Sequence, residues 1–312
     1  MSILLSPRCG EVALRIPVLL FIMVTFLTAC QQGGTVDLEG LKGRAQSGDP
    51  AACRKLVALL GEADRELHAR IYPFLLELGD QAIPYLLEEV ATSDRIRREQ
   101  VIAALGNLKA SQAAAPIARI LADRSLQRRY VAAWALGEID SPAALPALIA
   151  ALDDDDPEVA RYAVRALVRL NRKAIEHLLA YLPEASPRGA AGAVRALGDI
   201  GDPIALDSLL RQADGPSRPE VLRALGKLKD KRAEAVLIAG LSDPQWRHRM
   251  FAAMALGGAG TAAAVPQLRV ALEDEEMVVR EWAARSLEVL TGEHVTFRND
   301  QGEQVLPYSI YH

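Results

Sequence analysis

The sequence is poor in the residue types that most catalytic and metal sites require. Its 312 residues include three cysteines and five histidines, and aromatic residues make up only 5% of the chain. The cysteines match no common zinc spacing and indicate no disulfide framework: Cys9, Cys30 and Cys53. A nucleophile elbow, a phosphate-binding loop and the paired histidines of a zinc protease are also absent. We therefore predict no catalytic residue, no metal and no cofactor.

A strong excess of either charge is absent as well. The formal net charge is -4, and charged residues make up an ordinary 24% of the chain. Proteins that bind nucleic acid through a general electrostatic surface usually carry a strongly basic domain or stripe. We therefore expect no nucleic-acid partner. The abundance of alanine and leucine favours helices.

An apolar run near the amino terminus is too short to cross a membrane as a helix, which needs about 20 residues. Ile16 to Leu27 follows two arginines and precedes small residues, the layout of a secretory signal peptide. Its end, Leu27-Thr28-Ala29-Cys30, resembles the lipobox of bacterial lipoproteins. The resemblance implies that residues 1–29 are removed and that Cys30 carries a diacylglycerol and an acyl chain such as palmitate. An uncleaved anchor helix and a chance cysteine remain alternatives.

The residues after Cys30 bear on location. Gln31 to Gly34 are polar and glycine-bearing, as a tether requires, and we assign residues 30–48 to the tether and the start of a cap. Lipoproteins of two-membrane bacteria tend to stay in the inner membrane when aspartate follows the cysteine. Since Gln31 follows here, the resemblance implies a lipid anchor in the bacterial cell envelope, at the periplasmic face of the outer membrane.

An internal repeat dominates the rest of the chain. A motif such as "RALGDI" recurs around a leucine anchor at intervals of 28 to 31 residues. The seven anchors are Leu105, Leu136, Leu167, Leu197, Leu225, Leu256 and Leu287, and an earlier copy of the motif has its anchor at Leu75. Small residues one, three and four positions before each anchor form one helix face, where neighbouring helices can approach closely. Glycine follows five of these seven anchors, and we expect it to end the helix. A second apolar run follows in each unit.

These alanine-leucine-glycine units resemble HEAT repeats, in the short form first associated with phycobilisome lyases. The resemblance implies an all-α fold, an α/α superhelical solenoid of about eight helix pairs over residues 49–290. The tail, residues 291–312, alternates apolar and polar residues around Asn299 to Gly302, which predicts a short hairpin or an extended cap.

Acidic and basic residues recur at fixed distances before the anchors, with aspartate thirteen and arginine seven positions earlier. HEAT repeats use such residues as a ladder between adjacent units, in which the aspartate caps a helix and the arginine bonds back. Three units carry both residues: Asp123 with Arg129, Asp243 with Arg249, and Asp274 with Arg280. Two units have Ala160 and Ala190 in place of the arginine, so we predict an interrupted ladder in the middle of the array.

Two further features favour structural roles. The acidic run Asp153 to Asp156 precedes Pro157 at a predicted helix start, where a capping loop is favoured over a calcium site. Cys53 lies in an apolar helical pattern and is expected to be a core residue and not a reactive thiol.

Positions two and six before the anchors are expected to face the concave surface of the solenoid. They carry arginine, methionine and aromatic residues, the types enriched at protein interfaces. We predict that they bind a partner protein through an extended or acidic segment: Tyr130, Trp134, Arg161, Arg165, Arg195, Arg223, Met250, Met254 and Arg285. The alternative is that long arginine stems and Trp134 only cover apolar helix surface.

The favoured interpretation of function is a membrane-tethered scaffold, not an enzyme, that recruits a protein partner in the envelope through its concave face. One alternative is a lyase-like enzyme or enzyme subunit, by analogy with the bilin lyases that share the repeat. Another is a binder of cell-wall glycan or anionic lipid through the arginine row.

Overall fold

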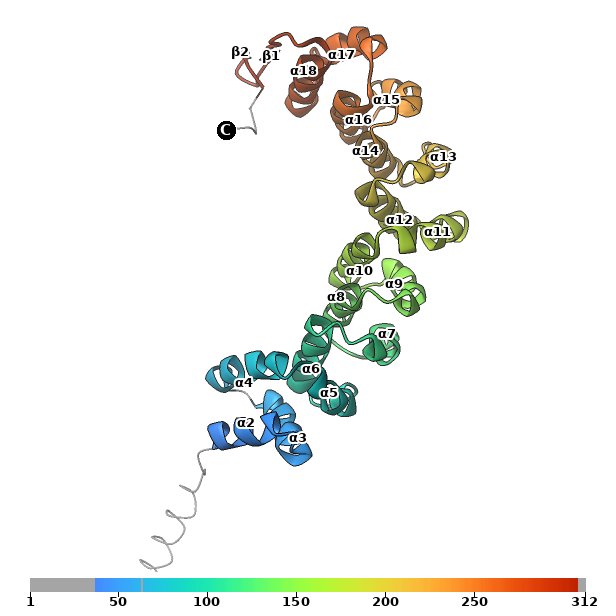
Figure 1. Ribbon diagram of the computed structural model, residues 1–312. Coiled ribbons are helices and arrows are strands. Elements are labelled where there is room, and N and C mark those ends of the chain that lie inside the picture. Colours follow the sequence, from blue (N-terminus) through green and yellow to red (C-terminus); the bar gives the residue numbers. More distant parts are fainter. Residues whose placement is uncertain (1–36, 63, 308–312) are drawn as a thin grey trace, which may run out of the picture.

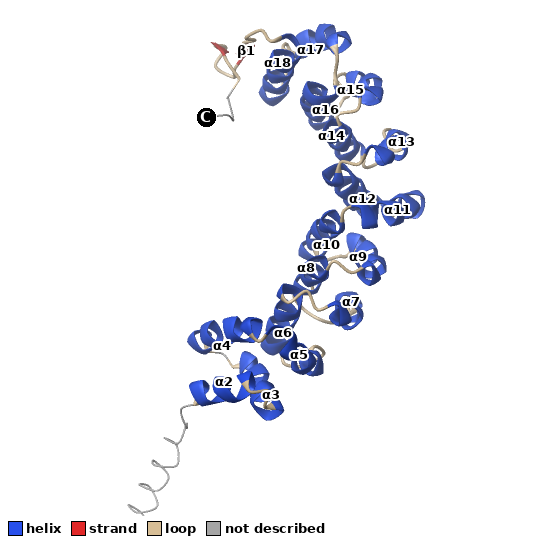
Figure 2. Ribbon diagram, in the orientation of Figure 1, coloured by secondary structure: helices blue, strands red, loops and turns tan. Residues whose placement is uncertain are grey.

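The fold is an arc of stacked helix pairs. The structure is a computed structural model that describes residues 37–62 and 64–307. Nearly all regular structure in these residues is helical, as Figure 2 shows. The prediction of an all-α solenoid with a short β tail is confirmed. Cys9, Cys30 and the predicted signal peptide lie outside the described residues.

The helices fall into two rows along the arc (Figure 1). The outer row is formed by the shorter helices α5 (Ile83–Glu89), α7 (Ala114–Ala122), α9 (Leu145–Ala150), α11 (Arg172–Tyr181), α13 (Leu206–Arg211), α15 (Glu234–Gly240) and α17 (Val265–Ala271). The inner row is formed by the anchor helices α6 (Arg95–Asn107), α8 (Tyr130–Ile139), α10 (Pro157–Leu170), α12 (Pro187–Ile200), α14 (Arg218–Leu228), α16 (Trp246–Ala259) and α18 (Met277–Thr291).

The amino-terminal end of the arc consists of α2 (Leu38–Gln46), α3 (Pro50–Ala58) and α4 (Arg65–Glu77). Aspartates cap all three helices by accepting hydrogen bonds from first-turn N–H groups: Asp37, Asp49 and Asp64. Leu75 on α4 is completely buried, like the later anchors. None of the helices in the described residues is long and apolar enough to span a membrane.

The core is one continuous layer between the two rows. The anchor leucines from Leu105 to Leu287 are at most 1% exposed, and they belong to one buried cluster with leucine and isoleucine residues of the outer row, such as Ile117 and Leu148. Each helix pair buries its apolar faces against the next pair, so burial accumulates along the arc as in other repeat proteins.

The expectation that glycine ends the anchor helices is wrong. The five glycines lie inside their helices, and a methyl group added to any of them would come within 2.5 to 3.0 Å of a small residue on the next anchor helix: Gly106, Gly137, Gly198, Gly226 and Gly257. The residues that do end α8, α12 and α14 in the left-handed region are Asp140, Gly201 and Lys229. At these five positions glycine is therefore selected by helix contact, whereas the glycine that ends α12 is a different one, Gly201.

A two-stranded antiparallel hairpin closes the carboxyl end of the arc. Strand β1 (Phe297–Arg298) pairs with β2 (Gln304–Val305), around the turn that the sequence indicated. Phe297 is buried in the core layer. Arg280 of α18 donates hydrogen bonds to the Arg298 carbonyl and the Asp300 carboxylate. The hairpin therefore supplies acceptors where a further repeat would otherwise supply them.

Candidate functional site

The buried ion pairs of the array join each arginine to the following unit. Arg129 binds Asp154 through two hydrogen bonds of 2.5 and 2.9 Å, and both side chains are less than one tenth exposed. The same guanidinium donates to the Leu121 carbonyl in its own unit. Burial raises the pKa of Asp154, but hydrogen bonds from Arg129 and from the Asp156 N–H outweigh it, so the pKa lies below its ordinary value.

The same contact recurs near the carboxyl end, again over 25 residues. Arg218 binds Asp243 at 2.8 Å, and Arg249 binds Asp274 at 2.7 and 2.9 Å. Asp123 makes no such contact, because it accepts hydrogen bonds from the N–H and hydroxyl groups of Ser125. The ladder residues thus hold repeats together, and this arrangement leaves their polar atoms little capacity for a ligand.

The ladder is absent between α10 and α12. Ala160 and Ala185 occupy the positions that correspond to Arg129 and Asp154 one repeat earlier. Val168 stands where the neighbouring anchor helices have glycine. This junction uses other contacts: the Ser186 hydroxyl donates to Asp153 at 2.6 Å, and Arg188 binds Asp155 at 2.9 Å.

The acidic run before α10 is fully engaged by these contacts. Asp154 and Asp153 are bound as described above, Asp155 also pairs with Arg124, and Asp156 caps α10 by accepting from the Glu158 N–H. Among the described residues, no three histidine, cysteine or acidic side chains are grouped so that they could hold a metal ion.

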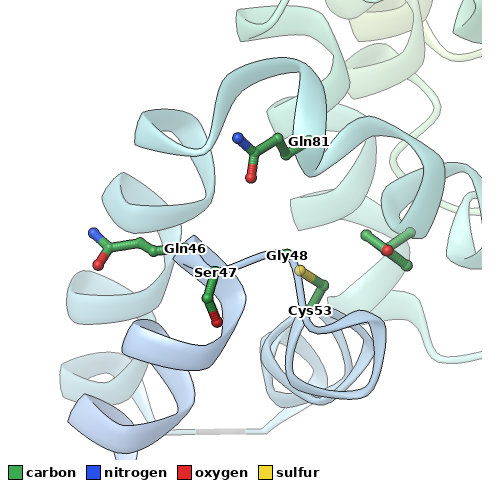
Figure 3. A pocket seen from close by; sticks show the side chains of 6 residues that line it. Gln46, Ser47, Gly48, Cys53 and Gln81 are labelled. Carbon is green, nitrogen blue, oxygen red and sulfur yellow. The ribbon is translucent and has the colours of Figure 1, made fainter.

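A cavity of about 380 Å³ lies beside Cys53, between α2, α3 and α5 (Figure 3). Its lining residues carry no acidic or basic side chain: Gln46, Ser47, Gly48, Cys53, Gln81 and Tyr85. Cys53 itself is only 2% exposed, and burial raises the pKa of its thiol. A protonated, buried thiol is a poor nucleophile, so this cavity offers no thiolate for chemistry.

The predicted concave residues all lie on the inner row of helices, with differing exposure. Arg161, Arg165 and Arg195 are exposed, whereas the others are partly buried: Tyr130, Trp134, Arg223, Met250, Met254 and Arg285. Carboxylates on the same row already bind three of the arginines, since Arg195 pairs with Glu220, Arg223 with Asp199, and Arg285 with Glu281. The row is therefore not a set of free cations waiting for an acidic partner.

An aromatic cluster connects α8 and α10. The rings of Tyr130 and Tyr162 lie 5.2 Å apart between centroids, tilted by 31°. The guanidinium carbons of Arg165 and Arg161 lie 5.2 and 5.6 Å from the Tyr162 centroid. Arg128 donates to the Tyr130 hydroxyl at 2.7 Å. We call these five residues the aromatic–arginine patch.

Sequence reasoning missed two members of this patch, Tyr162 and Arg128. Tyr162 is next to Arg161 in the sequence, but it is not at position two or six before its anchor, Leu167. Its contact with Tyr130 joins two different repeats. The available signal was the spacing of 32 residues, one repeat plus one position, which places the two rings on facing sides of neighbouring helices.

Comparison with known proteins identifies the repeat. The family model described as HEAT repeats matches residues 83–167, 145–223 and 209–288, which is more than half of the chain. Among solved structures, that of Kap121p superposes with a TM-score of 0.57 at 16% identity, covering 82% of this chain and 34% of Kap121p. At that identity the likeness concerns the fold alone.

Curated relatives share the sequence at a higher level. The phycocyanobilin lyase subunit beta of Thermosynechococcus vestitus is 41% identical over 92 residues, which cover 30% of this chain and 43% of the relative. The phycobilisome maturation protein of Synechococcus elongatus is 32% identical over 172 residues, covering 50% of this chain and 83% of the relative. The matched part thus spans less than half of the first relative.

These relatives contradict the interpretation of the chain as a non-enzymatic scaffold. They carry the names of a lyase subunit and a maturation protein, which favour the lyase-like alternative over both the scaffold and the binder of glycan or lipid. The physical reason for the error is that the repeat signature reports how helices pack. Surface residues decide chemistry, and one fold accommodates many surfaces.

Proposed function

Because this chain belongs to the HEAT-repeat proteins, we propose that its solenoid is a lyase-type subunit that binds a bilin. The observation that carries the proposal is the identity of 32 to 41% to two differently named proteins of bilin and phycobilisome maturation. We place the bilin on the concave face, because the inner helices carry the exposed or partly buried arginine and tyrosine side chains described above.

A bilin is an open chain of four pyrrole-type rings, conjugated and roughly planar in segments, with two propionate carboxylates. Such a ligand is bound best by a long surface that supplies flat side chains for the rings and guanidinium groups for the carboxylates. The inner row supplies both types of side chain over several successive helices. The pockets of the described residues lie at the amino-terminal end of the arc and not along these helices. We therefore propose that the ligand lies along the surface of the inner row.

The function is tested by direct binding and by transfer. The full-length chain, purified in detergent, is titrated with phycocyanobilin while its absorbance spectrum is recorded, and Kap121p serves as a control of the same fold. We expect a saturable spectral change with this chain and no change with Kap121p. In a second assay, the chain is mixed with phycocyanobilin, a second lyase subunit and an apoprotein that accepts the bilin. Faster covalent attachment of the bilin supports a lyase role. If the chain shows no bilin binding and no acceleration of attachment, the proposed function is contradicted.

We also propose a protein partner, because the relatives include a lyase subunit and a subunit acts with another chain. The idea that this partner binds through an extended or acidic segment has less support, since Arg195 and Arg223 already pair with carboxylates of their own chain. A second lyase subunit is the partner that the relatives favour.

A lipid anchor at Cys30 remains part of the proposal, with residues 1–29 as the signal peptide and the outer membrane's periplasmic face as the location. Its support is the lipobox-like sequence alone. Seven residues separate Cys30 from the start of α2 at Leu38, and they extend at most about 25 Å. The solenoid would therefore lie close to the membrane. Cys30→Ala is expected to move the protein to the soluble fraction of fractionated cells, while Cys53→Ala leaves it in the membrane fraction.

A further inference from the structure

The aromatic–arginine patch differs from the rest of the inner row in its uncompensated charge. Arg165 is exposed, and none of the described carboxylates lies within ion-pair distance of it. Its guanidinium is instead placed over the Tyr162 ring at 5.2 Å. Arg161 shares that ring and pairs with Glu158 on its own helix. One cation of the patch is therefore positioned without an anionic partner.

The tyrosines fix the geometry of that cation. Tyr162 contacts Tyr130 of the preceding repeat, and the Arg128 guanidinium holds the Tyr130 hydroxyl, which limits the rotation of both rings. Arg128 is itself bound to Glu99 of α6 at 3.3 Å. A network that spans α6, α8 and α10 thus holds two tilted tyrosine rings in place, with the Arg165 guanidinium over one of them. These three helices are neighbours in the inner row (Figure 1).

A flat ligand with a carboxylate at its edge fits this arrangement. Its ring adds a further member to the stack of tyrosine and guanidinium planes, and its carboxylate accepts two parallel N–H bonds from the guanidinium. Single-stranded nucleic acid uses similar stacking, but it also needs a positively charged track for its phosphates. The neighbouring arginines along this row are neutralised by Glu220 and Asp199. The ligand favoured by the local charge is therefore one with a few carboxylates and not a polyanion.

We propose that the aromatic–arginine patch binds a propionate-bearing pyrrole ring of the bilin, with Arg165 on the carboxylate and Tyr162 and Tyr130 against the ring. This inference rests on the proposed function, because it assumes that the ligand is a bilin. It adds a location, α8 and α10, and a role for each residue. Arg161 neutralises Glu158 and so keeps that carboxylate from repelling the propionate.

The test compares two probes and matched variants of the full-length chain. Biliverdin carries both propionates free, and biliverdin dimethyl ester lacks their charge but keeps the conjugated rings. Arg165→Gln removes the proposed carboxylate contact, and Tyr162→Leu removes the stacking face. Arg195→Gln is the control, because Arg195 occupies the same position before its anchor, is also exposed, and is already paired with Glu220. Circular dichroism and melting temperature establish that each variant is folded.

The expected result is that Arg165→Gln weakens biliverdin binding about tenfold and leaves binding of the dimethyl ester unchanged. Tyr162→Leu weakens binding of both probes, and Arg195→Gln weakens neither. If the wild-type protein binds biliverdin and Arg165→Gln binds it equally well, the patch proposal is overturned while the proposed function stands. An equal loss in Arg195→Gln also overturns it, because the contribution is then general charge. If the wild-type protein binds no bilin, both proposals fail. Should Tyr162→Leu prove unfolded, the comparison of the two arginine variants decides.

Discussion

Gly226 of α14 lies so close to Ala255 of α16 that a methyl group added to the glycine would be 2.6 Å from the alanine Cβ and 2.7 Å from its Cα. The Cα is part of the helix backbone and the Cβ is bonded directly to it, so neither atom can move away by a side-chain rotation. The two inner helices can remain at this separation only while the position is glycine.

We therefore predict that Gly226→Ala destabilises the protein, although alanine is the better helix former. Overpacking costs about 1–3 kcal/mol, which exceeds the gain of about 1 kcal/mol in helix propensity. The control is Gly43→Ala in α2, where nothing lies within 4 Å of the added methyl group. That variant is expected to gain stability. Urea unfolding of the two variants measures the difference, and equal stabilisation of both would contradict the close contact.

A second prediction concerns the buried pair of Arg129 and Asp154. Arg129→Met leaves a buried carboxylate without its cation, and we expect a loss of about 3 kcal/mol in the free energy of unfolding. Asp155→Asn is the control, because Asp155 lies nearby but its side chain is 81% exposed. It is expected to change stability by less than about 1 kcal/mol. Thermal and urea unfolding at neutral pH provide the measurement.

The same pair predicts a dependence on pH. The folded-state pKa of Asp154 is lowered, so its ionisation stabilises the folded protein above the unfolded-state pKa of about 4. That contribution is lost as pH falls through the lower, folded-state pKa. The stability difference between wild type and Asp154→Asn is thus expected to be constant at neutral pH and to shrink under acid conditions. A difference that stays constant down to the lowest pH at which the protein is folded would contradict it.

Local periodicity made most of this fold predictable. The anchors and their flanking alanines predicted buried helix faces, because burial along a helix follows a period that sequence displays directly. The role of glycine was misread because termination and close packing select the same residue. Gly226 could be assigned only once Ala255 was known to lie opposite it. The ladder residues were evident by type, whereas the choice of Asp154 as partner of Arg129 depends on the stacking of repeats.

The candidate site was less predictable for a related reason. Arg195 and Arg165 occupy equivalent positions in the repeat, yet within residues 37–62 and 64–307 only Arg195 has a carboxylate, that of Glu220, at ion-pair distance. That difference arises from side chains on a neighbouring helix and is invisible in a column of equivalent positions. The same applies to Tyr162, whose importance comes from contact with Tyr130.

A fourth prediction concerns Cys53. In a Cys9→Ala/Cys30→Ala variant, Cys53 is the only thiol, and burial both hides it and raises its pKa. We expect maleimide labelling of the folded protein at neutral pH to be slow, and labelling in denaturing urea to be rapid. Labelling in urea is the control for reactivity of the thiol itself. Rapid labelling of the folded protein would mean that the cavity shown in Figure 3 admits reagents to Cys53.

The last prediction concerns the junction of α10 and α12, which lacks both the ladder pair and the packing glycine. Ala160 and Ala185 are 25 residues apart, the same separation as Arg129 and Asp154. The double variant Ala160→Arg/Ala185→Asp therefore recreates a ladder contact, and we expect it to stabilise the junction by about 1 kcal/mol. Each single variant places one partly buried charge without its partner and is expected to give no gain in stability. A double-mutant cycle in urea isolates the interaction of the two residues.

Hydrogen exchange locates the effect. Because each repeat contacts only its neighbours, a gain at one junction is expected to slow exchange mainly in α10 and α12 and to leave α16 and α18 unchanged. The intact contact of Arg249 with Asp274, between those last two units, serves as the internal reference. If the double variant showed no coupling energy and no local slowing, the missing contact would not be what distinguishes this junction, and the alternative contacts of Ser186 and Arg188 would already hold it as firmly as a ladder pair.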